Sequence, residues 1–477
     1  MGLKRVLLVN TNLERAPYPV PPLGLCLLAD ALGARYEVKI YDGVFDGGRN
    51  LIALVREFNP DFIGFSIRNI DDVVMDREIF YMDDILEKFI RPVKKITDVP
   101  VILGGSGFSI FPAELMAMTG ADFGIVGEAE AVLPVLLDRI QQHMDTSDLP
   151  CLITAKSPEV QAGLGLEYSA PVQGRFAGID RRIDFTPYLS KGVYSIQTKR
   201  GCAHACIYCT YPLIEGRKFR MRSPSDIATE IEDAHQRLGY ITFEFVDSTF
   251  NDPEGHAESI CREIISRNIK VRLRTMGINP RHANEQLFEL MLRAGFVQID
   301  ATPDSASPRI LKNLCKGFDL VSIERMALMI RKFDIPTMWF FLFGGPGEDE
   351  VTFRETLDFI DNFIDPADLV YMNAGLRIYP RTPLYAIAEK EGRIAAGQTV
   401  FRPPVYYYSA NIAKNRLDQL IRQAALLRHN CIPALETAPL PEMVAEAVEI
   451  RKIHQLEEPM FRTLLRIRAK WRREGKI

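Results

Sequence analysis

Five short apolar runs alternate with longer amphipathic segments in the first third of the chain. Near-continuous apolar runs of this length are typical of buried parallel strands, so we predict strands at residues 4–10, 36–42, 61–66, 100–105 and 123–127. Helices are expected between them, for example at residues 21–32 and 50–58. Strands that alternate with helices predict an α/β fold, with a doubly wound (Rossmann-like) parallel sheet over residues 1–145.

The same alternation resumes at about residue 191. Six further runs predict strands, at residues 192–198, 241–247, 270–274, 295–300, 337–343 and 369–373. Helices are expected in the gaps, for example at residues 227–238, 284–293 and 321–332. Six such β/α units predict a central partial (β/α)6 barrel over residues 191–400, whose functional residues lie at the carboxyl ends of the strands.

Two stretches lack this alternation. Residues 146–190 are irregular and hold four scattered prolines (Pro150, Pro158, Pro171 and Pro187), which indicates a linker with a small hairpin. Residues 401–477 begin with an aromatic turn and continue as helices near residues 413–429, 443–456 and 460–473, so we predict a C-terminal helical region.

Composition narrows the function classes. The 477 residues exceed one ordinary domain, and 47% hydrophobic with 25% charged residues indicates a globular enzyme. The net charge of −4 gives no basic field for nucleic acid, so no nucleic-acid partner is expected. We expect no signal peptide and no transmembrane segment, because no apolar run is long enough. Eight irregularly spaced cysteines indicate reduced thiols in a cytoplasmic protein.

Three of those cysteines fall within eight residues, in the stretch from Lys199 to Thr210. Cys202, Cys206 and Cys209 can turn three thiolates toward one iron-sulfur cluster. Four-iron clusters usually take four cysteines, so three leave one iron open to bind a small molecule. The alternative is zinc with His204 as fourth ligand, although structural zinc sites usually pair two short Cys/His hooks and the sequence shows no second hook.

The spacing Cys-x3-Cys-x2-Cys, with Tyr208 before the last cysteine, resembles the signature of the radical S-adenosylmethionine (SAM) superfamily. The resemblance implies a 4Fe-4S cluster on Cys202, Cys206 and Cys209, whose open iron holds the amino and carboxylate groups of SAM. Reductive cleavage of SAM would then give a 5'-deoxyadenosyl radical.

Further barrel residues are expected to contact SAM. Asp247 stands where the family carries an acid that meets the SAM amino group; the alternative is a helix cap. Arg274 can pair with the SAM carboxylate or form a surface salt bridge. Asp304 replaces the longer glutamate that the family usually places near the SAM ribose. The turn after the fifth barrel strand resembles the family's Gly-x-Pro-Gly-Glu turn beside SAM, which implicates Gly344, Gly345, Pro346 and Glu348.

The first domain resembles the cobalamin-binding domain attached to many radical SAM enzymes. Three pieces carry the likeness: residues 21–25, 104–106 and 122–130. A Rossmann nucleotide domain is the alternative, but its Gly-x-Gly-x-x-Gly fingerprint is absent. The residues expected to contact cobalamin follow the strands: Thr11, Ser66, Asn69, Gly104, Gly105, Gly127 and Glu128.

One departure from the cobalamin pattern is informative. The first of the seven histidines is His143, so no Asp-x-His-x-x-Gly motif can place an imidazole under cobalt. We expect the lower face of cobalt to meet water, a weak side chain or nothing, with the loop at residues 68–72 beneath it. The alternative is that the domain has lost cobalamin and only docks on the barrel.

These resemblances imply a cobalamin-dependent radical SAM enzyme that methylates an unactivated carbon through methylcobalamin and a 5'-deoxyadenosyl radical. The alternatives are a non-methylating oxidation, cyclisation or rearrangement, a methylthiotransferase, and a non-catalytic cofactor-binding protein. We expect a monomer that uses a small-molecule, natural-product or lipid substrate and an external electron donor such as flavodoxin or ferredoxin. No role is assigned to the remaining cysteines: Cys26, Cys151, Cys261, Cys315 and Cys431.

Two features of the C-terminal region stay open at this point. The three tyrosines at residues 406–408 either line the substrate cavity or pack the region on the barrel. Seven Lys or Arg residues follow Phe461, against one acid, Glu474. Such a run touches a membrane surface or an acidic partner in some proteins, but a solvated helix is its usual meaning.

Overall fold

The computed structural model describes residues 2–75, 77, 79–155, 176–190, 192–239, 241–436 and 438–477. Within these residues the first sheet contains six strands in the order β2-β1-β3-β4-β5-β6. The five predicted strands are confirmed and parallel: β1 (Lys4–Asn10), β2 (Tyr36–Asp42), β3 (Phe62–Ser66), β4 (Val101–Gly104) and β5 (Phe123–Ile125). The sixth, β6 (Leu152–Thr154), pairs antiparallel with β5 and was not predicted, because its three residues lie in the irregular segment.

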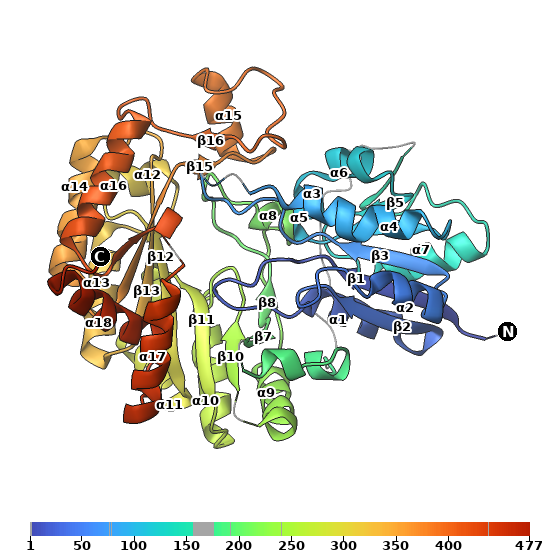
Figure 1. Cartoon of the computed structure of the whole chain (residues 1–477), viewed down its shortest axis with the longest axis horizontal. Helices are drawn as coiled ribbons and strands as arrows, with labels where there is room; N and C mark the ends of the chain where they lie inside the picture. The colour runs from blue at the N-terminus through green and yellow to red at the C-terminus, as the bar shows by residue number, and fades with distance from the viewer. Residues whose placement is uncertain are drawn as a thin grey trace.

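Helices cover both faces of this sheet, as the doubly wound prediction requires (Figure 1). Along β1, Val6 and Leu8 face the core beside α1 (Leu23–Leu32) and α7 (Val132–Gln141). Leu7 and Val9 face the opposite core. That second core contains α2 (Leu51–Phe58), a helical stretch made of α3 (Tyr81–Ile85), the π-helical turn Leu86–Ile90 and α4 (Arg91–Lys94), and α6 (Pro112–Thr119).

The second sheet has seven parallel strands in the part of the chain that the structure describes, in the order β17-β14-β13-β12-β11-β10-β7. Six of them match the predicted barrel strands: β7 (Tyr194–Ile196), β10 (Thr242–Phe245), β11 (Arg272–Ile278), β12 (Phe296–Asp304), β13 (Thr337–Phe343) and β14 (Leu369–Ala374). The seventh, β17 (Cys431–Pro433), comes from the region for which only helices were predicted. It extends the partial barrel by one strand.

Outer helices follow the strands around the barrel. They are α9 (Pro224–Leu238), α10 (His256–Ser266), α11 (Glu285–Ala294), α13 (Leu320–Phe333), α14 (Glu350–Phe363) and α16 (Lys414–Leu427). Several begin at a side-chain cap that satisfies free backbone N–H groups. Asn284 caps α11 and Asp319 caps α13, and Asp349 forms a capping box with Thr352 at the start of α14.

The C-terminal helices α17 (Pro441–His454) and α18 (Met460–Arg473) lie close to their predicted bounds. The basic side chains of α18 pair with acids of this chain: Arg462 with Asp334 and Asp368, Arg468 with Glu436, and Lys470 with Glu446. These ion pairs tie α18 to the rest of the chain, whereas the sequence predicted a solvated helix or a contact with a membrane surface or an acidic partner. Among the described residues, no helix is both long and apolar enough to cross a bilayer.

Two of the tyrosines at residues 406–408 differ in burial and in contacts. Tyr407 is buried in the first domain's core, in β16 (Tyr406–Tyr407), which pairs antiparallel with β15 (Leu376–Arg377). Tyr408 is half-buried, and its hydroxyl contacts the Met75 sulfur. Tyr407 therefore packs the C-terminal region, whereas Tyr408 lies where loops of both domains meet.

The predicted hairpin of the linker lies largely outside the described residues, since Pro158 and Pro171 belong to residues 156–175. The end of the linker is tied to the first domain. Tyr188 donates a hydrogen bond of 2.5 Å to Asp42, and the Ala177 N–H donates one of 3.1 Å to Asp30.

Candidate functional site

The cysteine loop lies between the two domains. It follows β8 (Lys199–Arg200) and leads into α8 (Tyr211–Ile214), which contacts α5 (Ser106–Ile110) of the first domain (Figure 1). Ile207 is buried in the same apolar core as the first domain. The helix α5 follows the carboxyl end of β4. The loop therefore meets the edge of the first sheet at which ligands of such sheets bind.

The three thiols of the loop form one group of donors. Cys202 is buried, and Cys206 and Cys209 are half-buried. Burial raises the pKa of Cys202 and Cys206, and burial together with the nearby Cys206 and Cys202 thiols raises that of Cys209 to about 12. Such mutual influence requires the thiols to be neighbours. Three adjacent thiols on one loop fit the donor set of a 4Fe-4S cluster with one open iron.

The His204 side chain is hydrogen-bonded to a carboxylate. Its Nε2 lies 2.8 Å from Asp252 Oδ2, and Asn279 donates a hydrogen bond of 2.7 Å to the same oxygen. Among the described residues, no group of three or more His, Cys, Asp or Glu side chains is placed to hold a single metal ion. The zinc hypothesis therefore loses its proposed fourth ligand.

Asp247 lies beneath the cysteine loop, at the end of β10, and is fully buried. Its carboxylate accepts hydrogen bonds from the Thr198 N–H (2.8 Å) and hydroxyl (2.5 Å), and it forms an ion pair of 3.0 Å with Lys199 Nζ. Lys199 is buried as well, and its ammonium also donates to the Phe250 carbonyl at 3.1 Å. Asp247 therefore anchors the strand that leads into the loop, and its expected contact with the SAM amino group stays a prediction.

Asp304 also has partners within the protein. Lys316 Nζ lies 2.6 Å from Asp304 Oδ2, and the Tyr208 hydroxyl donates a hydrogen bond to the same oxygen. Lys316 donates a further hydrogen bond of 3.2 Å to the Thr302 carbonyl. Asp304 thus links β12 to the cysteine loop, and its expected contact near the SAM ribose stays a prediction. Lys316 was missed by sequence reasoning, because it follows a short helix without any motif.

Arg274 is directed into the barrel. Its Nε lies 2.7 Å from Glu244 Oε1, and its guanidinium stacks on the Tyr18 ring, 4.3 Å from the ring centroid. Tyr18 belongs to the loop after β1, and its hydroxyl donates a hydrogen bond of 2.6 Å to Glu244. Arg274 is thus in an ion pair inside the barrel and not in a surface salt bridge, and its expected contact with the SAM carboxylate stays a prediction.

The turn after β13 is stabilised by its own glutamate. Glu348 Oε2 accepts hydrogen bonds from the N–H groups of Gly344 (2.6 Å) and Gly345 (3.2 Å). Burial raises the pKa of Glu348 to about 7. The Pro346 carbonyl accepts a hydrogen bond of 2.8 Å from Asn313. Glu348 therefore shapes the turn from inside, and the carbonyls of Gly344 and Gly345 accept hydrogen bonds from the N–H groups of Ser409 and Glu348.

The strand ends of the first domain bring most of the predicted cobalamin residues together. Ser66 pairs in register with Asn10 on one side and Gly104 on the other. Thr11 is buried and donates a hydrogen bond of 2.8 Å to the Ser66 carbonyl. The strand order places these residues beside the switch point between β1 and β3. Gly104 has open space where a side chain would be, since a Cβ there would come no closer than 3.9 Å to its nearest neighbour, the Ile125 carbonyl oxygen.

Gly105 is required by the protein itself. Its φ of +100° is one that L-residues rarely adopt, and a Cβ there would lie 2.6 Å from the Ile67 carbonyl oxygen. The glycine therefore permits close approach of the loops after β3 and β4. Gly127, after β5, donates a backbone hydrogen bond of 2.8 Å to the Ser109 hydroxyl. Both glycines shape the edge at which a cobalamin tail would lie.

The loop expected beneath cobalt keeps few free side chains. Asp71 forms a buried ion pair of 3.0 Å with Arg377, and Asp72 lies 2.5 Å from Arg77. Asn69 donates a weak hydrogen bond of 3.4 Å to Asn12. Arg68 is exposed and close enough to Tyr211 of α8 to influence it electrostatically. Arg68 and Asn69 are therefore the side chains of this loop best placed to face a ligand.

Glu128 serves domain docking. Its two carboxylate oxygens accept hydrogen bonds from the two terminal nitrogens of Arg220, one of them at 2.8 Å, and Arg200 lies 3.0 Å from it. Arg200 also pairs with Glu130 at 2.5 Å. Glu128 therefore pairs with arginines of the second domain, and its expected contact with cobalamin stays a prediction. These arginines carry no motif in the sequence, and the strongest signal for them was the pair of acids after β5.

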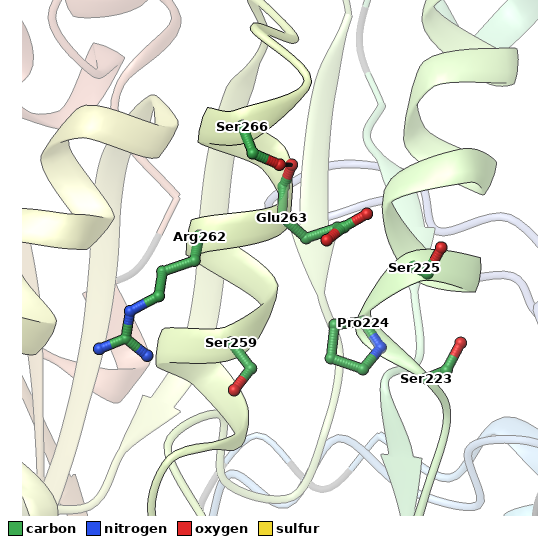
Figure 2. A pocket seen from close by; sticks show the side chains of 7 residues that line it. All are labelled: Ser223, Pro224, Ser225, Ser259, Arg262, Glu263 and Ser266. Atoms are coloured by element: carbon green, nitrogen blue, oxygen red, sulfur yellow. Dashed lines mark hydrogen bonds between the residues drawn. The ribbon is translucent and has the colours of Figure 1, made fainter.

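A surface depression lies elsewhere on the barrel. Figure 2 shows it between the start of α9 and the flank of α10, with a volume of about 510 Å³. Serines, Pro224 and the neighbouring Arg262 and Glu263 line it. The depression lies among the outer helices, so it is separate from the strand ends and the cysteine loop.

The comparisons with known proteins agree with this geometry. A family model described as the B12 binding domain matches residues 9–137, and the model of the radical SAM superfamily matches residues 196–360. The chain carries a B12-binding domain and a radical SAM domain. The first match ends in α7, and the second runs from β7 to α14. Strands β14 and β17 of the radical SAM barrel lie beyond the matched residues.

Individual relatives span most of the chain. A tryptophan 2-C-methyltransferase of Streptomyces laurentii is 26% identical over 441 residues, which cover 79% of this chain and 73% of the relative. An uncharacterised methyltransferase of Pyrococcus horikoshii is 25% identical over 415 residues, covering 81% and 84%. The structure of the radical SAM methyltransferase TsrM from Kitasatospora setae, with cobalamin and a [4Fe-4S] cluster bound, superimposes with a TM-score of 0.82 at 22% identity over all of both chains. The two-domain fold is therefore shared with TsrM.

Proposed function

We propose that the chain is a cobalamin-dependent radical SAM enzyme that methylates a carbon of a small-molecule substrate. The observation that carries the proposal is the position of the cysteine loop, between the carboxyl edge of the B12-binding sheet and the radical SAM barrel. The relatives named as methyltransferases support the reaction type. When bound, the cluster would supply the electron that cleaves SAM, and cobalamin would carry the methyl group.

The residues of this chain have distinct tasks in that reaction. Cys202, Cys206 and Cys209 hold the cluster, and the Lys199–Asp247 pair fixes the strand that carries them. The backbone of residues 344–346 is proposed to contact SAM. Residues 66 and 104, at adjacent strand ends, are proposed to contact cobalamin, together with Asn69. The two arginines that bind Glu128 keep the domains docked, so that water is excluded from the space between them.

The number of cysteines in the first domain argues against a methylthiotransferase. A methylthiotransferase would need further cluster-binding cysteines in its first domain, but Cys26 is the only cysteine before residue 150. Cys26 is buried in an apolar core, and burial raises the pKa of its thiol. A cobalamin radical SAM enzyme that oxidises, cyclises or rearranges its substrate shares every residue above, so only the products separate it from a methylase. An external donor such as flavodoxin or ferredoxin is proposed to supply the electron to a monomeric enzyme.

The products formed from SAM test the proposal. The protein is reconstituted anaerobically with iron, sulfide and cobalamin, reduced, and incubated with SAM labelled with deuterium in its methyl group. We expect S-adenosylhomocysteine, because transfer of the methyl group to reduced cobalamin requires no organic substrate. The exposed Cys315 offers a control, Cys315→Ser, that keeps the cluster ligands intact.

Two results would count against the proposal. If SAM is converted only to 5'-deoxyadenosine and never to S-adenosylhomocysteine, methyl transfer is excluded and the non-methylating alternative holds. If about four irons bind per chain without cobalamin, the first domain is a docking platform and the methylation mechanism has to be abandoned.

A further inference from the structure

The inner face of the radical SAM sheet is less completely buried than its outer face at several positions. Along β13, residues 339 and 341 are buried toward the outer helices, whereas Phe340 and Leu342 are only partly buried. Along β11, Leu273 is fully buried but Met276 is 44% exposed. Side chains of a strand alternate between its two faces, so the exposed positions share the inner face. We call the space bordered by the inward side chains of β10 to β14 the lumen.

One wall of the lumen is charged and internally paired. Glu244, Arg274 and Gln298 form one row across β10, β11 and β12. Arg274 and Glu244 are ion-paired at 2.7 Å, and Tyr18 of the first domain donates to the same glutamate oxygen. The charges of Arg274 and Glu244 therefore offset each other.

Asp300 adds a second acid to this wall, and the single guanidinium of Arg274 acts electrostatically on both Glu244 and Asp300. It is 7% exposed, and its neighbours Ile299 and Ala301 are in the outer core, so its own side chain is directed into the lumen. Gln298 donates a hydrogen bond of 3.1 Å to Oδ1. The described residues supply no hydrogen-bond partner for Oδ2. A buried carboxylate without a cation of its own is costly to keep in a fold, and burial raises its pKa to about 6 even though Arg274 opposes that shift.

The adjoining wall of the lumen, formed by β13 and β14, is apolar. Phe340 of β13 and Tyr371 of β14 have ring centroids 5.4 Å apart, and Met338 is the register partner of Asp300. Both rings come from half-buried inward positions. The lumen therefore combines an apolar surface with one unmatched negative charge. A ligand with an apolar body and a positively charged group complements both walls.

The position of Asp300 along β12 relates it to the cysteine loop. Asp304, which contacts Tyr208 of the loop, lies four residues further along the same strand. At 3.2–3.4 Å per strand residue this separation is about 13 Å. A ligand whose charged group binds at Asp300 would thus extend its body toward the site of the chemistry.

We propose that Asp300 binds a positively charged nitrogen of the substrate, so that the substrate class is an organic amine with an apolar or aromatic body. The inference deepens the proposed function and rests on it, because the ligand of Asp300 is a substrate only if the protein is the proposed enzyme. The acid, its burial and its missing partner define the charge of the ligand. The apolar wall around Phe340 indicates that the rest of the ligand is apolar or aromatic.

Pairs of probes that differ in charge test the inference on the unmodified protein. Equilibrium binding of phenethylamine and tryptamine is compared with that of 3-phenylpropionate and indole-3-propionate, which carry a carboxylate in place of the ammonium group. The reconstituted protein is used without SAM or reductant. We expect each amine to bind at least about tenfold more tightly than its carboxylate counterpart, as loss of a charge-assisted hydrogen bond implies.

A variant locates the selectivity. Asp300→Asn keeps the side-chain volume and removes the charge, and should weaken amine binding roughly ten- to a hundredfold. Asp98→Asn makes the same change at an exposed position of the first domain and should leave amine binding unchanged. Equal binding of the paired probes, absence of amine binding, or an amine affinity that survives Asp300→Asn would each overturn the inference.

The binding assay is independent of the reaction. If amines bind at Asp300 but S-adenosylhomocysteine never forms, the proposed methylation fails while the charge selectivity of the lumen stands. If S-adenosylhomocysteine forms but amines do not bind, methylation stands and the amine inference fails.

Discussion

Arg220 and Glu128 form a two-point ion pair that joins the two domains. Arg220 lies in β9 (Arg220–Met221), which pairs with the strand before the cysteine loop, and Glu128 follows β5 of the first sheet. One of the two contacts measures 2.8 Å. Such parallel contacts fix the relative orientation of the groups as well as their distance, so this pair sets how the cysteine loop faces the first domain.

Replacing Glu128 should loosen this interface. Glu128→Ala leaves Arg200 and Arg220 short of a carboxylate, and breaking a buried ion pair costs roughly 3–5 kcal/mol. We expect a lower free energy of unfolding in denaturant titration and faster limited proteolysis between the domains. Glu57→Gln, at an exposed position of α2, is the control. An unchanged unfolding curve would show that other contacts dominate docking.

The variant Asp247→Asn distinguishes two roles of Asp247, namely anchoring the strand before the cysteine loop and contacting SAM. The substitution leaves the buried Lys199 ammonium without its counter-ion, so the free energy of unfolding of the cofactor-free protein should fall by roughly 3–5 kcal/mol. Iron incorporation should fall with it, because the loop strand is no longer held. Normal stability combined with weakened SAM binding would instead support the contact that the family resemblance implied.

Cysteine substitutions should divide sharply by position. Alanine at Cys202, Cys206 or Cys209 should abolish a stable 4Fe-4S cluster, measured as iron and sulfide content and as visible absorption of the reconstituted protein. Cys315→Ser, a change at an exposed residue, should keep about four irons per chain. Full cluster content in any of the three alanine variants would exclude that cysteine as a ligand.

Asp300 should make stability depend on pH. Burial raises its folded-state pKa to about 6 from an ordinary value of 3.8. The folded state therefore binds the proton more tightly than the unfolded state. The resulting stabilisation is complete below pH 3.8 and is lost as pH rises to about 6, by roughly 3 kcal/mol for this group.

The comparison with Asp300→Asn isolates this contribution. The variant lacks the titrating group, so its free energy of unfolding should exceed that of the wild type above pH 6 and lose this advantage toward pH 4. Chemical denaturation of the cofactor-free proteins across this range measures the difference. A constant difference at all pH values would mean that Asp300 keeps an ordinary pKa in the folded protein.

Strand periodicity predicted the fold well, because parallel strands covered by helices are apolar on both faces. It failed where strands are short, as with Cys431–Pro433, whose three residues cannot show a period. For the candidate site, the sequence predicted where residues lie along the strands but not the partners of their side chains. Asp247 stands at the expected strand end, but its side chain pairs with Lys199, which is 48 residues away and carries no local signal.

Two acidic residues within the predicted barrel strands indicate a polar inner face. Glu244 lies between Phe243 and Phe245, and Asp300 lies between Ile299 and Ala301, so each acid has apolar residues on both sides. In a parallel strand buried on both faces such a charge is unfavourable unless the inner face is polar. Whether each acid has a basic partner depends on the register between neighbouring strands. The sequence pattern alone does not determine that register.

Tyr18 belongs to the first domain, yet its ring stacks on Arg274 inside the barrel of the second. The two sequence modules are therefore not separable in function. The radical SAM barrel expressed without the first domain would lack Tyr18, which forms part of the wall around the proposed substrate site. Exchanging first domains between relatives would exchange that wall as well, so selectivity among reactants is inherited jointly from both modules.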